Sequence, residues 1–133
     1  MPLSIAYNLS GSRILIVNDE GENQELLKTI IKSLGHEPEI AGDGFDALAK
    51  LKLDIDLVLL DITMPRMDEF EVVRQIRENP DFSNLPVLLV TALTSKSDRL
   101  RAVEAGANDF ISKPVDITKL QVWVRSLLRM KEA

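Results

Sequence analysis

The sequence predicts an α/β protein: a doubly wound (βα)5 sandwich of three layers around a five-stranded parallel sheet. Short runs of apolar and β-branched residues alternate five times with longer segments of helical periodicity, which is the pattern of repeated strand–helix units. Several of the short runs lack polar alternation, as is typical of strands that helices cover on both faces. Right-handed crossovers between parallel strands then place helices on both sides of the sheet.

The five strands are predicted at the short apolar runs. The first, third and fourth show no polar alternation, whereas the second is short and charged and suits an edge of the sheet. The predicted strands cover residues 13–17, 37–41, 56–60, 86–91 and 109–112.

Each predicted helix has its own start or stop signals. Gly35 ends the first helix, and Asp43 precedes a second helix that runs to about Leu53. Asp68 and Glu71 form a capping box for a third helix that ends at residues 79–80. The fourth helix is capped by Ser95 and ends at residues 105–106, and the last follows Asp116. The apolar face of the first helix comprises Leu26, Leu27, Ile30, Ile31 and Leu34.

Length and composition limit the possible functions. A chain of 133 residues makes one domain, expected at residues 13–133 after a flexible arm at 1–12. The absence of cysteine excludes disulfides, thiolate metal sites and a cysteine nucleophile. A net charge of −5 argues against direct nucleic-acid binding. No apolar run is long enough for a membrane span, and the first residues do not form a secretory signal, so we expect a cytoplasmic protein.

Polar side chains follow the predicted strands at the carboxyl edge of the sheet, where ligands of such folds bind. Asn18, Asp19 and Glu20 follow the first strand, and Asp61 follows the third. Thr91 ends the fourth strand, and Lys113 follows the fifth. The sequence therefore predicts two carboxylates, a hydroxyl and an amine at one edge.

This set of groups suits phosphoryl transfer. Two close carboxylates repel each other unless a cation neutralises them, and Mg²⁺ binds one or two carboxylates together with phosphate oxygens. A lysine and a hydroxyl can contact a phosphoryl group, and an aspartate can attack it to form an acyl phosphate. Asp61 fits the nucleophile best because it ends the strand that we expect to be the most buried, which would hold it rigidly.

Four motifs resemble the receiver domain of bacterial two-component response regulators: ILIVNDE, DLVLLDITMP, LLVTA and DFISKP, which begin at residues 14, 56, 88 and 109. The resemblance covers residues 13–129, with every motif in order. It implies a flavodoxin-like sheet with strand order 2-1-3-4-5.

The resemblance also implies roles for individual residues. Asp61 would accept the phosphoryl group, and Asp19 would bind Mg²⁺ directly. The backbone carbonyl of Thr63 would be the third protein ligand, and Asn18 would act on the metal through water. Lys113 would pair with the phosphoryl oxygens, with a cis bond to Pro114.

Two further residues would act as a switch. Thr91 would move onto the phosphoryl group and Phe110 would turn inward, while the small Ala92 leaves access to Asp61. The implied partners are a sensor histidine kinase or histidine phosphotransfer protein and a downstream output domain or protein. The receiver would catalyse only its own phosphorylation and slow dephosphorylation. The alternative is a receiver-like interaction module that acts without phosphorylation.

Asn18 departs from the family pattern, which has a second carboxylate at this position. An amide oxygen accepts a hydrogen bond from a metal-bound water less strongly than a carboxylate does. We therefore expect weaker Mg²⁺ binding than in a receiver with the carboxylate.

Two other interpretations explain fewer residues. Residues 42–47 match the G-x-G-x-x-A dinucleotide fingerprint, and Asp61 lies at about the expected 20 residues further on, but the charged preceding strand is unlike a central first strand. A phosphatase of the haloacid dehalogenase type needs a carboxylate where this chain has Thr63.

His36, the only histidine, is expected in a surface loop, which leaves no His-based triad or metal site.

The last predicted helix carries a candidate interaction surface. Trp123 and Met130 lie about 90° from the centre of its apolar stripe, as a partly covered flank or as part of a binding surface. The resemblance implies that the fourth helix, fifth strand and fifth helix form the output face and a possible homodimer interface. The stripe itself comprises Ile117, Leu120, Val124, Leu127 and Leu128.

Overall fold

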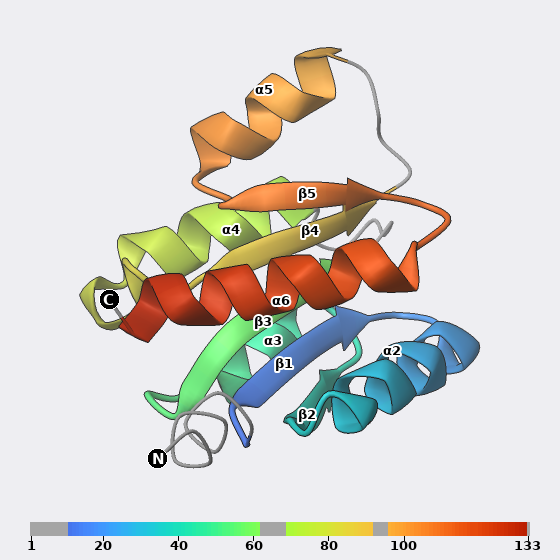
Figure 1. Ribbon diagram of the computed structural model, residues 1–133. Coiled ribbons are helices and arrows are strands. Elements are labelled where there is room, and N and C mark those ends of the chain that lie inside the picture. The colour runs from blue at the N-terminus through green and yellow to red at the C-terminus, as the bar shows by residue number, and fades with distance from the viewer. Residues whose placement is uncertain (1–10, 62–68, 92–95, 133) are drawn as a thin grey trace.

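The computed structural model describes residues 11–61, 69–91 and 96–132, with side chains to residue 129. It contains one sheet of five parallel strands in the order β2-β1-β3-β4-β5 (Figure 1). The predicted doubly wound α/β class is confirmed, and so is the strand order that the resemblance implies. The strands are β1 (Arg13–Asn18), β2 (Glu37–Ala41), β3 (Ile55–Asp61), β4 (Val87–Thr91) and β5 (Asp109–Ser112).

The helices form two layers on opposite faces of the sheet (Figure 1). One face packs against α2 (Gly21–Ser33) and α6 (Ile117–Glu132). The other packs against α3 (Gly44–Lys50), α4 (Glu69–Glu78) and α5 (Lys96–Ala105). A short 3-10 helix, η1 (Pro80–Phe82), follows α4.

The central strands are buried because both of their faces meet a helix layer. In β1, Ile14 and Ile16 belong to one hydrophobic core, and Leu15 and Val17 belong to the other. This explains why the first, third and fourth predicted strands show no polar alternation. β2 is partly exposed and lies at the edge of the sheet, as predicted.

The helix ends confirm several predicted signals. Gly35 and Gly106 adopt positive φ angles of 88° and 105° directly beyond α2 and α5, conformations that glycine adopts without strain. Asp116 Oδ1 accepts the Lys119 N–H at 3.2 Å, so it caps α6. The predicted caps Asp68 and Ser95 lie outside the described residues.

Helix α3 is shorter than predicted. It ends at Lys50 rather than near Leu53, and Leu51 is already extended. The reason is that β3 begins at Ile55, and the Ile55 N–H closes a turn onto the Lys52 carbonyl at 3.0 Å. The chain needs these residues to return from the helix layer to the sheet.

Three side chains differ from the predicted burial. Leu26 is 51% exposed because it lies about 100° around α2 from Leu27. Ile117 is 50% exposed because it is the first residue of α6, where the side chain points back past the end of the helix. His36 is buried, not on a surface loop, because Gly35 reverses the chain and the His36 N–H donates to the Ile31 carbonyl at 3.2 Å.

The dinucleotide interpretation is wrong. The strand before residues 42–47 is the edge strand β2, not a central one. Within that segment Asp43 Oδ1 accepts the Asp46 N–H at 2.8 Å, so it caps the seven-residue α3.

The predicted arm falls mostly outside the described residues, which begin at Gly11. Gly11 N–H donates to the Gly35 carbonyl at 2.6 Å, and the Ser12 carbonyl accepts the Glu37 N–H at 2.9 Å. Within the described part of the chain, no helix has both the length and the apolar character needed to cross a bilayer.

Candidate functional site

Asn18 and Asp61 lie side by side at the carboxyl ends of β1 and β3. The register of the two strands pairs them directly. Both side chains are buried, and Asn18 Nδ2 donates to Asp61 Oδ2 at 2.8 Å. Asn18 Oδ1 accepts the Glu20 N–H at 2.7 Å, which fixes the amide at the start of α2. The two neighbouring strand ends thus form the floor of the site.

Lys113 approaches Asp61 from the far side of β4. Its Nζ lies 2.5 Å from Asp61 Oδ1, and its side chain is 27% exposed. The Lys113 backbone N–H donates to the Thr91 carbonyl at 2.9 Å, and the bond to Pro114 is cis, as the resemblance implies. Both oxygens of Asp61 therefore contact donors from this chain.

The environment of Asp61 raises the pKa of its carboxyl group. Burial raises the pKa of Asp61 above its ordinary value, and the Lys113 ammonium opposes that rise. The charges of Asp19 and Glu20 raise the pKa further. The acidic groups are thus close enough to repel each other.

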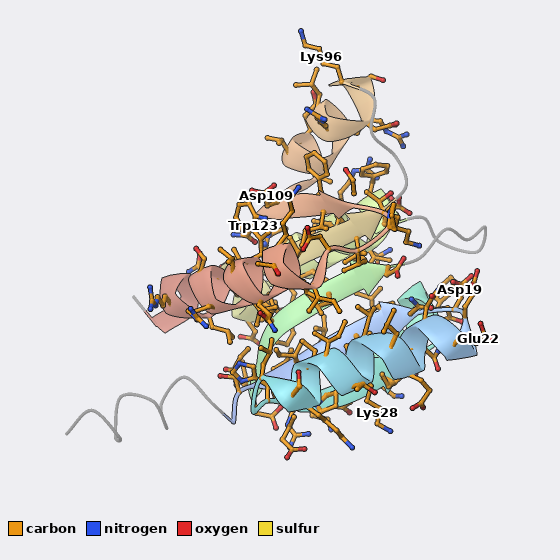
Figure 2. All side chains as sticks on the ribbon, turned by 45° about the vertical axis from the view of Figure 1, so that its right-hand side comes forward. Asp19, Glu22, Lys28, Lys96, Asp109 and Trp123 are labelled. Atoms are coloured by element: carbon orange, nitrogen blue, oxygen red, sulfur yellow. The ribbon has the colours of Figure 1, made fainter. Side chains whose placement is uncertain are left out.

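The available donors fit a magnesium ion. Asp19 and Asp61 offer oxygen ligands, and a divalent cation would relieve the repulsion between them. Asp19 is exposed and lies beside the start of α2 (Figure 2). Thr63, the third expected ligand, lies outside the described residues.

Asn18 changes the character of this site. Its amide is neutral, and the described residues contain no group of three or more His, Cys, Asp or Glu side chains placed to hold a metal. Its oxygen contacts the Glu20 N–H and its nitrogen contacts Asp61. The expected contact through a metal-bound water stays a prediction.

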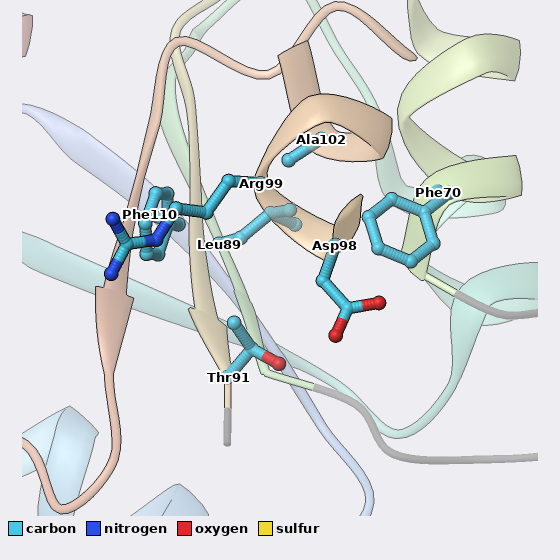
Figure 3. Close-up of a pocket in the computed structure, with 7 residues that line it drawn as sticks. All are labelled: Phe70, Leu89, Thr91, Asp98, Arg99, Ala102 and Phe110. Atoms are coloured by element: carbon cyan, nitrogen blue, oxygen red, sulfur yellow. The ribbon is translucent and has the colours of Figure 1, made fainter. Parts of the chain in front are cut away.

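Thr91 and Phe110 line one small pocket beneath α5 (Figure 3). Thr91 is buried at the end of β4, and Phe110 of β5 packs against the core on the α5 side of the sheet. The Arg99 guanidinium lies 5.3 Å from the centre of the Phe110 ring. The pocket therefore connects the edge that carries Asp61 to helix α5. Ala92 lies outside the described residues.

Trp123 lies on the opposite side of β5, in a groove between β5 and α6. It is half-buried and packs against the core beneath α6, and Figure 2 shows it on α6 near β5. Lys113 and Lys119 line the same groove. The expectation of a partly covered flank is thus confirmed, whereas a role in binding stays a prediction. The Met130 side chain lies outside the described part.

Sequence reasoning missed two residues of this site. Gln24 Nε2 donates to the Asn18 carbonyl at 2.6 Å, which joins α2 to the end of β1. Arg99 covers the Phe110 ring. The sequence could not predict these contacts. A polar residue in the first turn of a helix has a partner that depends on how the helix packs against the sheet, and no local pattern shows this.

Comparison with known proteins identifies the family. The family model of the response regulator receiver domain matches residues 14–125. The chain is 42% identical over 121 residues to the response regulator PleD of Caulobacter vibrioides, a match that covers 90% of this chain and 27% of PleD. The chain therefore spans about a quarter of that relative.

Solved structures agree with this match. The receiver domain of a signal transduction histidine kinase from Syntrophus aciditrophicus is 35% identical, with a TM-score of 0.81 over 90% of this chain and 91% of that one. The receiver domain of the sensor histidine kinase PA1611 from Pseudomonas aeruginosa is 28% identical, with a TM-score of 0.80 over 90% and 99% of the two chains. That structure is described with a magnesium ion coordinated in the active site cleft.

Fold and sequence therefore agree over most of the chain. This chain belongs to the receiver domains of two-component response regulators, which are signalling proteins rather than classical enzymes.

Proposed function

We propose that this domain is a phosphorylation-activated switch that accepts a phosphoryl group on Asp61. The observation that supports this most strongly is the buried Asp61 carboxylate, held at the carboxyl edge of the sheet within 2.5 Å of the Lys113 ammonium. The donor is a phosphohistidine of a sensor kinase or a phosphotransfer protein.

The transfer exchanges one bond to phosphorus for another. An Asp61 oxygen forms a P–O bond as the P–N bond to the donor histidine breaks, and the imidazole keeps the electron pair of that bond. Lys113 contacts the phosphoryl oxygens and compensates their charge. A bound Mg²⁺ would neutralise the charge of the transferring group, held by Asp19, Asp61 and the Thr63 carbonyl, with Asn18 acting through water.

The switch uses the pocket that Thr91 and Phe110 share. Phosphorylation adds a charge of about −2 at neutral pH, and the Thr91 hydroxyl moves toward it. Phe110 then turns inward against the same pocket, which changes the packing of α5. This change in packing alters the face formed by α5, β5 and α6, through which the domain acts on its partner. Here α5 is the fourth helix predicted from the sequence and α6 is the last.

This face would contact the downstream partner. An output domain, a separate output protein or a second copy of the domain binds there, and Trp123 contributes to the contact. Replacement of Trp123 by alanine should weaken dimerisation or partner binding in the phosphorylated state. The domain does not bind nucleic acid directly, because its net charge is −5, and it acts in the cytoplasm.

The first test is intact mass after incubation with Mg²⁺ and a small acyl-phosphate donor. We expect one phosphate adduct that requires Mg²⁺, with none on the Asp61→Asn variant. An adduct that persists on the variant would contradict the assignment of Asp61.

The alternative is an interaction module that needs no phosphorylation, which the neutral Asn18 favours. If this alternative holds, the intact domain forms no phosphate adduct, and the Asp61→Asn variant binds its partner as the wild type does. The retained Asp19, Asp61, Thr91 and Lys113 support the switch instead.

A further inference from the structure

The Asp61 carboxylate is held from both sides by groups of this chain. Asn18 Nδ2 donates to Oδ2 at 2.8 Å, and Lys113 Nζ lies 2.5 Å from Oδ1. Two carboxylates that lie close together normally need a cation to balance their charges. Here one ammonium balances one buried carboxylate, and a neutral amide occupies the position beside them.

The orientation of the Asn18 amide is set independently of Asp61. Its Oδ1 accepts the Glu20 N–H at 2.7 Å, and a backbone N–H can only donate. The NH2 end of the amide must therefore point toward Asp61. Gln24 Nε2 also donates to the Asn18 carbonyl at 2.6 Å, which anchors the residue from α2.

We propose that Asn18 is a positioning residue whose amide holds Asp61 in a charge-balanced resting state that does not depend on a divalent cation. The inference rests on the proposed function for the role of Asp61 as phospho-acceptor. A cation that binds Oδ2 competes with the Asn18 N–H for the electron pairs of that oxygen. The amide thus opposes metal binding in the resting domain, beyond the mere loss of a charge.

An aspartate at position 18 would reverse this situation. Its carboxylate would lie within hydrogen-bond distance of Asp61 without a proton to donate, so the two groups would repel each other. The folded state would then need a cation, or a proton, to relieve the repulsion. The magnesium dependence of stability is therefore the property that Asn18 controls.

The experiment measures the unfolding temperature of the whole domain in EDTA and in excess Mg²⁺, without a phosphodonor. The variants are Asn18→Asp and the control Asn84→Asp. Asn84 is exposed and precedes β4, at the opposite end of the sheet from Asp61. The control makes the same change of amide to carboxylate away from the site.

We expect the wild-type temperature to change by less than about 1 °C on adding Mg²⁺, because weak binding contributes little stability. Asn18→Asp should unfold about 5 °C lower in EDTA and recover most of that loss in Mg²⁺. Asn84→Asp should follow the wild type in both conditions. In the double variant Asn18→Asp/Asp61→Asn, the EDTA deficit should disappear because the repelling partner is gone.

Two results would overturn the inference. One is a wild-type protein that gains as many degrees from Mg²⁺ as Asn18→Asp does, and this comparison stands even if that variant does not fold. The other is an Asn18→Asp variant that is as stable as the wild type in EDTA. Neither result depends on phosphorylation, so a failure here is distinct from a failure of the mass test on Asp61.

Discussion

Lys113 contacts Asp61 across an intervening strand. Lys113 follows β5 and Asp61 ends β3, and β4 lies between these two strands in the sheet. The Lys113 Nζ nevertheless lies 2.5 Å from Asp61 Oδ1. The Lys113 N–H donates to the Thr91 carbonyl, so β4 itself supports the bridge. The ion pair and this backbone hydrogen bond together join three strand ends, and the ammonium compensates the buried carboxylate.

Removal of the Lys113 charge should destabilise the fold. Lys113→Met leaves the buried Asp61 carboxylate without its compensating charge, and we expect a loss of about 1–3 kcal/mol in the free energy of unfolding at neutral pH. Urea unfolding measures it. Lys119→Met removes a charge from an exposed side chain of α6 and should change stability little. If Lys113→Met lowers the free energy of unfolding by the same amount in the Asp61→Asn variant, the loss does not come from the Asp61 carboxylate and the explanation is contradicted.

The stability of the wild type relative to Asp61→Asn should fall as the pH rises. Because the pKa of Asp61 is raised in the folded state, the folded protein holds this proton at pH values where the unfolded chain has lost it. The resulting stabilisation is complete below the ordinary pKa of 3.8 and is lost as the pH passes through the folded pKa. Urea titrations of both proteins between about pH 4 and 7.5 measure the difference. A difference that does not change with pH would contradict the raised pKa.

His36 should titrate below its ordinary pKa. Burial lowers the pKa of His36, and the nearby Asp56 opposes this shift. The folded state therefore disfavours the charged ring, so stability falls as the pH drops below 6.5. Since this is the only histidine, NMR of its ring protons follows one titration, with the midpoint expected below 6.5. The chain in concentrated urea is the control, and an equal or higher midpoint in the folded protein would refute the shift.

Arg77 should contribute more to stability than a neighbouring arginine. Its guanidinium donates to the carbonyls of Phe82, Leu85 and Gly106 and to Asn108 Oδ1, at 2.6 to 3.0 Å. A lysine has no planar fork to serve these acceptors, so Arg77→Lys should cost about 1–3 kcal/mol. Arg74→Lys keeps an exposed ion pair with Glu71 and should change stability by less than about 0.5 kcal/mol. Equal effects in urea unfolding would show that the contacts of Arg77 add nothing.

The strands could be predicted almost completely. Each of the five begins and ends within one residue of its predicted bounds. For β1, β3 and β4 the reason is that a strand buried on both faces appears in the sequence as a run without polar alternation. The end of α3 could not be predicted from the sequence, since it depends on where β3 joins the sheet. The burial of His36 depends on the reversal at Gly35, and no periodic pattern extends across such a turn.

The candidate site divides in the same way. The sequence alone determined which chemical groups occur at the ends of the strands, because the order of strands and helices brings those ends to one edge. Only the tertiary structure decided which atoms meet there: that the Asn18 amide presents its nitrogen to Asp61, and that Lys113 reaches across β4. Periodicity is a local property of the chain, whereas side-chain orientation, burial and the resulting pKa shifts depend on packing between segments far apart in sequence.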